Sequence, residues 1–160
     1  MSTKKCKAIF TTPKKFNPIS AIVKLVTGEK YTHCAWVTII DDLPEKPLVY
    51  HASKFNVHFI SFKNFLDHND IVHEFEFELD REEYLDTLNF CIDHLGQSYD
   101  FLGLIFNPFF KLFGIKNKAN ICSELLIKIL KAKIHYYGEV ENIVPEEVKV
   151  AIEHYKNLEE

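Results

Sequence analysis

Four cysteines, Cys6, Cys34, Cys91 and Cys122, are the residues of this sequence best suited to covalent chemistry. They are widely spaced without a Cys-x-x-Cys pair, which argues against a structural zinc site and favours reduced thiols in a cytosol-like compartment. Cys122 follows Asn120, a residue suited to cap a helix, by two positions. Unpaired N–H groups in a first helical turn favour a thiolate and can hold an oxyanion. The alternative interpretation is a cysteine packed as a small hydrophobe.

Two histidines could complete such a site. His33 lies in the predicted central strand Tyr31 to Ile40, where an imidazole must either find partners for both nitrogens or serve a neighbouring thiol as general base. His51, on the next strand, could orient His33 as a third polar group. A hairpin centred near Pro44 would offset the two histidines by about four residues, roughly 13 Å, whereas one centred nearer Asp42 would bring them opposite each other.

The elements that must position these residues change type halfway along the chain. Alternation predicts strands at 6–11, 31–40, 48–53, 56–62 and 71–79, with a helix from Asn17-Pro18 to Gly28 between the first two. Helical spacing predicts later helices that begin at Asp80, at Asn120 and at Pro145, the first with an apolar stripe of Leu85, Leu88, Ile92 and Leu95. The pattern favours one α+β domain over residues 1–160 with a mostly antiparallel sheet. Cys34 should face away from His33 and serve in packing.

Composition narrows the classes of partner. Hydrophobic residues make up 47% and the net charge is −4, with only short lysine pairs, so we expect a globular domain that does not bind nucleic acid. The N-terminus lacks the apolar run of a secretory signal, and no apolar stretch is long enough to predict a transmembrane segment. The segment Phe101 to Ile115 is rich in Phe, which favours a buried helix pair; the alternative is a wall for an acyl chain or a surface that contacts a membrane peripherally.

Several short motifs, taken in order, resemble a known superfamily. They are Tyr31-Thr32-His33, the strand that ends in Val49-Tyr50-His51, Gly96-Gln97-Ser98-Tyr99-Asp100, and Asn120-Ile121-Cys122-Ser123-Glu124-Leu125. The order, with His first and Cys near the end, resembles the circularly permuted branch of the NlpC/P60 superfamily, which includes lecithin–retinol acyltransferase-like and YiiX-like proteins. The resemblance covers most of the chain, from about Phe10 to the helix after Pro145.

The resemblance implies a papain-like core and assigns roles. Cys122 matches the nucleophile, His33 the base and His51 the polar orienting residue, and Tyr99, Ser123 and Tyr31 fall where the oxyanion or substrate is bound. It implies neither a metal nor another cofactor, and the histidine pairs of the sequence lack the helical spacing of a metal site.

The predicted function is therefore a cysteine-dependent acyl-transfer enzyme. It would hydrolyse, or transfer the acyl group of, a peptide, cell-wall peptide or lipid substrate in a cytoplasmic, virion or host-cytosol setting. The alternatives are a binding or structural protein that retains the fold without turnover, and a hydrolase that needs a metal ion. The sequence leaves the oligomeric state open.

Overall fold

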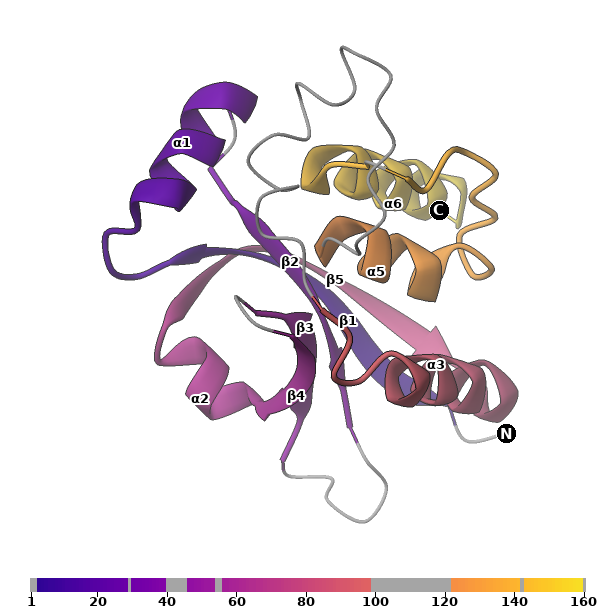
Figure 1. The fold of residues 1–160 in the computed structure, drawn as a ribbon. Helices are drawn as coiled ribbons and strands as arrows, with labels where there is room; N and C mark the ends of the chain where they lie inside the picture. Colours follow the sequence, from indigo (N-terminus) through magenta and orange to yellow (C-terminus); the bar gives the residue numbers. More distant parts are fainter. Residues whose placement is uncertain are drawn as a thin grey trace.

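The computed structural model describes residues 3–28, 30–39, 46–53, 56–98, 122–141 and 143–159. Within these residues the chain has an α+β fold built on a five-stranded antiparallel sheet in the order β4-β3-β2-β1-β5 (Figure 1). The strands are β1 (Lys4–Pro13), β2 (His33–Thr38), β3 (Leu48–Ala52), β4 (Val57–Ser61) and β5 (Asn69–Leu79). The predicted class is confirmed, and each predicted strand overlaps an observed one. The predicted central strand is indeed central, since β2 lies between β1 and β3.

Helix ends follow the capping residues of the sequence. α1 (Pro18–Thr27) begins after Asn17, whose side-chain oxygen accepts a hydrogen bond from the Ser20 N–H at 3.4 Å, and it is followed by Gly28 with φ of 73°. α3 (Arg81–Asp93) begins with a complete capping box between Asp80 and Glu83, both bonds being 2.9 Å. α6 (Pro145–Glu159) begins at the predicted proline.

One short helix was not predicted. α2 (Phe62–Leu66) begins directly after β4, with Ser61 as its N-cap. The sequence 56–62 alternates as a strand does, and a single helical turn of five residues is too short to leave a periodic signal. α2 nevertheless matters for the fold because it places buried Phe65 against the sheet.

The two faces of the sheet are covered by different helices. α3, α5 (Cys122–Leu130) and α6 lie on one face, and α2 covers the other (Figure 1). Alternation along β2 sends Cys34 and Trp36 to the first face, and Ala35 and Val37 to the second. The first face holds the larger core. Both faces of β2 are thus buried, which explains its uninterrupted apolar sequence.

The predicted apolar stripe of α3 is wrong except at Leu88. Leu85 and Ile92 remain 44% and 51% exposed, whereas Tyr84 and Cys91 are buried. The buried pair lies one position earlier along the helix and shares its face with partly buried Leu88. Leu and Ile count for more than Tyr and Cys in a pattern of apolar residues. The pattern therefore predicted that a neighbouring face of the same helix is buried.

Some predictions fall outside the described residues: those for the segment Phe101 to Ile115, for the cap Asn120 and for Tyr99. Among the helices that the structure describes, none has the length and apolar character needed to cross a bilayer.

Candidate active site

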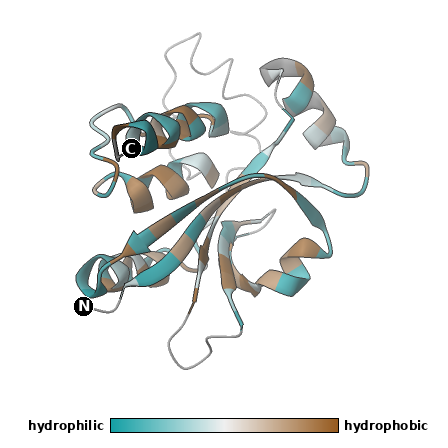
Figure 2. Ribbon diagram, turned by 180° about the vertical axis from the view of Figure 1, so that it is seen from behind, coloured by the Kyte–Doolittle hydropathy of each residue, from teal (hydrophilic) through white to brown (hydrophobic). Residues whose placement is uncertain are grey.

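Cys122 is the first residue of α5, and its side chain is only 2% exposed. α5 packs on β2 and β3 with α6 behind it, and Figure 2 shows α5 hydrophobic along most of its length. Being buried on nearly every side, the helix needs this apolar sequence, CSELLIKIL. Its first turn points N–H groups that lack helical partners toward the Cys122 end, where negative charge is favoured.

The thiol of Cys122 has a pKa well below its ordinary value. The largest cause is a hydrogen bond from the Cys34 thiol, and the charge of His33 and a hydrogen bond to its ring lower the pKa further, against the effect of burial. In return, burial and the contact with Cys122 raise the pKa of Cys34. We place the negative charge on Cys122, because it also lies at a helix N-terminus and beside an imidazole. The structure thus places the Cys122 thiol close enough to the His33 ring for the two groups to interact electrostatically.

Cys34 is a residue of this site that sequence reasoning missed. It faces away from His33 along β2, as predicted, but it lies on the face that α5 covers. Its thiol therefore contacts Cys122 instead of serving in packing alone. Strand alternation gives the face of Cys34, yet only the three-dimensional structure shows that the Cys122 helix lies on that face.

His33 and His51 form a hydrogen-bonded pair. Trp36 pairs with Tyr50 across β2 and β3, so the register extended by one residue sets His51 opposite Ala35, two residues from His33 on the same face. This offset lies between the two hairpins that the sequence allowed, and such diagonal neighbours are within reach of ring side chains. Nε2 of His33 and Nδ1 of His51 are 3.3 Å apart, with ring centroids at 5.5 Å.

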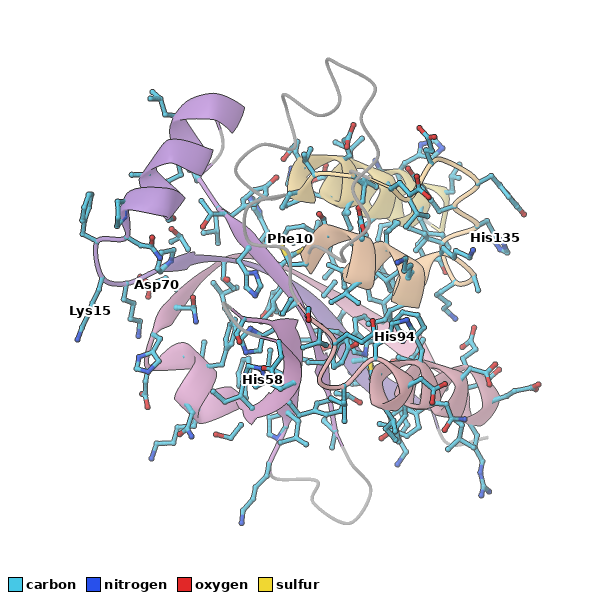
Figure 3. All side chains as sticks on the ribbon, viewed as in Figure 1. Phe10, Lys15, His58, Asp70, His94 and His135 are labelled. Atoms are coloured by element: carbon cyan, nitrogen blue, oxygen red, sulfur yellow. The ribbon has the colours of Figure 1, made fainter. Side chains whose placement is uncertain are left out.

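His51 is neutral at ordinary pH. Burial, followed by the charges of His33 and His58, lowers its pKa from 6.5 to about 3. Neutral His51 can accept at Nδ1 the proton that His33 holds on Nε2, and its own proton then lies on Nε2. His58, labelled in Figure 3, lies on β4 directly across from His51, and the centroids of the two rings are 4.6 Å apart. His33 is left with Nδ1 to meet the Cys122 thiol.

The remaining predicted site residues lie as follows. The Ser123 hydroxyl is buried and donates a hydrogen bond to the Ile143 carbonyl, so it joins α5 to the segment before α6. Tyr31 is also buried, with its ring against Phe10 and His73; within the described residues its hydroxyl has no hydrogen-bond partner. The oxyanion and substrate roles of these residues stay predictions.

A narrow apolar hollow adjoins the thiol on the side of α5. It lies between this helix and strands β2 and β3, and it has no room for a water molecule. Its lining comprises Cys34, Ala35, Trp36, Tyr50, His51, Ala52, Cys122, Leu125, Leu126 and Ile129. Water is excluded from this hollow, so on this side a charge on Cys122 is little screened by solvent.

No protein-family model and no curated protein matches this chain. The superfamily resemblance therefore rests on the sequence motifs and stays a prediction.

Proposed function

We propose that this protein is a cysteine-dependent acyl-transfer enzyme, a hydrolase of amide or ester bonds, with a permuted papain-like core. Cys122 is the nucleophile, His33 the general base and His51 the residue that orients His33. The observation that carries the proposal is that the Cys122 thiol, at the start of a helix, lies close enough to Cys34 and His33 for both to lower its pKa. Reactive cysteines occupy such electropositive positions, whereas buried structural thiols are inert.

The chemistry follows from the proton positions. His33 takes the thiol proton on Nδ1 while its Nε2–H donates to His51. The Cys122 thiolate attacks the substrate carbonyl carbon, and the oxyanion is held by N–H groups at the start of α5. Collapse breaks the bond to the amine or alcohol, which leaves with the His33 proton. Water, deprotonated by His33, then attacks the thioester, and the acid and the thiol are released.

The substrate is a peptide, a cell-wall peptide or a lipid acyl group. The chemistry requires a reduced Cys122, and the four cysteines of the chain are free thiols, which suits a cytosolic or virion setting.

The test compares the alkylation of single cysteines by iodoacetamide as a function of pH, with each labelled peptide quantified by mass spectrometry. We expect Cys122 to react near neutral pH, well before Cys91, a matched buried thiol whose pKa burial raises. His33→Ala and Cys34→Ala should each move the Cys122 profile to higher pH, because each removes a group that stabilises the thiolate. For each unit by which the Cys122 labelling profile moves to higher pH, the fraction of Cys122 present as thiolate at a pH below the pKa falls about tenfold.

A Cys122 that labels no earlier than Cys91 would contradict the proposal. So would a profile that neither substitution moves. The substrate class is then identified by assaying turnover of ester and peptide acyl donors. Turnover by the enzyme should be lost in Cys122→Ala.

One observation favours a second candidate, a binding protein without turnover. The Cys122 side chain is 2% exposed, so a substrate carbonyl must displace neighbouring atoms to reach it. In that case Cys122 would still label early with the small reagent, but no acyl donor would leave a thioester on it. Mass spectrometry of the acid-quenched protein separates the two candidates.

A further inference from the structure

Helix α1 has an apolar sequence but packs little against the other elements that the structure describes. Its ten residues, PISAIVKLVT, include one charged side chain, Lys24. Figure 1 shows α1 set apart from the sheet and from α5 and α6, and it has few contacts with the other described elements. Phe16, just before the helix, and Leu25 within it are 87% and 85% exposed. Isolated exposed apolar residues are common, but two large ones on and beside one apolar helix define an unpartnered surface.

The charges around this surface are one-sided. Lys14, Lys15, Lys24 and Lys30 flank or belong to α1, whereas residues 1–28 contain neither Asp nor Glu, in a chain whose net charge is −4. Asp70 is an acidic neighbour, 3.8 Å from Lys14, and Glu29 follows the helix in the sequence. Figure 3 shows Lys15 extending outward from the turn between β1 and α1. The surface therefore combines apolar side chains with an excess of positive charge.

We propose that α1, with Phe16, docks the protein on a membrane surface rich in anionic lipid headgroups. An interfacial helix buries its apolar side chains at the boundary of the acyl chains while lysines contact the headgroups. The lysines on both sides of Phe16 and Leu25 match this division. A protein groove would instead bury the apolar side chains without a need for several lysines around them.

The attachment of α1 ties the docking surface to the candidate active site. The Ser20 hydroxyl on α1 hydrogen-bonds to the hydroxyl of Thr32 at 2.9 Å, and Thr32 directly precedes His33. A membrane bound by α1 thus lies next to the chain that carries the proposed base. Docking itself needs no catalysis, so it stands or falls separately from the proposed function.

Co-sedimentation of the full chain with lipid vesicles tests the proposal. We expect binding to phosphatidylcholine vesicles that contain phosphatidylserine, weaker binding to phosphatidylcholine alone, and release by high salt. The double variant Phe16→Ser, Leu25→Ser should lower the partition coefficient by about tenfold or more, because it removes the inserted side chains. Lys15→Gln with Lys30→Gln should lower it by about tenfold on anionic vesicles only.

Matched controls come from exposed residues elsewhere. Tyr137→Ser with Leu158→Ser removes two exposed apolar side chains, and Lys46→Gln with Lys131→Gln removes two exposed lysines. Both pairs should leave binding unchanged. The proposal is overturned if the wild type binds neither vesicle, or if the control pairs lower binding as much as the α1 pairs. Cys122→Ala should bind vesicles as the wild type does, because docking does not use the thiol. If the wild type binds vesicles but its Cys122 is not alkylated early, the enzyme proposal fails and the docking proposal stands.

Discussion

At the scale of single residues, three imidazoles and two thiols meet where β2, β3, β4 and α5 come together. His51 connects the set, since one nitrogen bonds to His33 and its ring lies tilted against the ring of His58. Its depressed pKa fits the role of a neutral acceptor, which fixes the ring of His33 and the tautomer that faces Cys122. The burial that keeps His51 neutral also means that protonating it in the folded state costs free energy.

That cost predicts a dependence of stability on pH. The folded-state pKa of His51 is about 3, below the unfolded value of 6.5, so between these values the unfolded chain binds a proton that the folded chain does not. Stability from this group is therefore complete above pH 6.5 and lost as the pH falls toward 3. At the steepest, the free energy of unfolding should drop by about 1.4 kcal/mol per pH unit.

Urea unfolding at several pH values measures the slope. His51→Gln should flatten it between pH 6.5 and 4, whereas His154→Gln, an exposed histidine on α6, should not. Equal slopes in the wild type and His51→Gln would show that His51 is not held neutral by the fold.

At the scale of elements, α5 does two things with adjacent residues. Cys122 faces the strands, while Ser123 bonds to the carbonyl of Ile143, on the segment that leads into α6. A helix start that positions a reactive group must itself be held, because small displacements of a nucleophile cost much of its rate. The hydrogen bond of Ser123 supplies such a hold.

Ser123→Ala should lower the free energy of unfolding by about 1–3 kcal/mol, because the buried Ile143 carbonyl loses its donor. Ser98→Ala, at an exposed position, should change it by less than about 0.5 kcal/mol. Chemical denaturation measures both. If Ser123→Ala instead keeps its stability and loses turnover, the hydroxyl belongs to the substrate site, as the sequence motif implies.

At the scale of the whole molecule, the sheet separates two hydrophobic cores. The candidate site lies at the start of β2, beside residues from both cores. His33 contacts Phe65 of α2 on one side, with ring centroids 6.3 Å apart, and Cys122 of α5 on the other. Its place as the first residue of β2 allows this, because the strand ends there. The site thus depends on helices that are far apart in the sequence.

The layer of α6 behind α5 should accordingly be important for stability. Ile152 of α6 is fully buried in the larger core, and Ile152→Ala should cost about 2–5 kcal/mol in the free energy of unfolding. Leu158→Ala, on the same helix but 74% exposed, is the matched control and should cost less than about 0.5 kcal/mol. Similar losses in the two variants, measured by urea unfolding, would contradict this packing of α6.

Local signals in the sequence were sufficient for the strands and for the starts of α1, α3 and α6, but not for the short helix α2. The Asn17 cap with Gly28, the box of Asp80 with Glu83, and Pro145 predicted three helix starts, because capping depends on residues within one turn. Alternation located the strands and the face of Cys34 for the same reason. The face that α3 buries was not predictable, since choosing between Leu85 and Tyr84 depends on which neighbour the helix packs against.

What only the tertiary structure decided is which of these residues meet. Cys122 and His33 are separated by most of the chain, and the register between Trp36 and Tyr50 sets the distance from His33 to His51. The sequence allowed two registers and the structure adopts a third, because packing on both faces of β2 and β3 selects the pairing. The place of Cys34 in the site also depends on long-range packing. The sequence predicted which face of β2 holds Cys34, but not that α5 packs on that face.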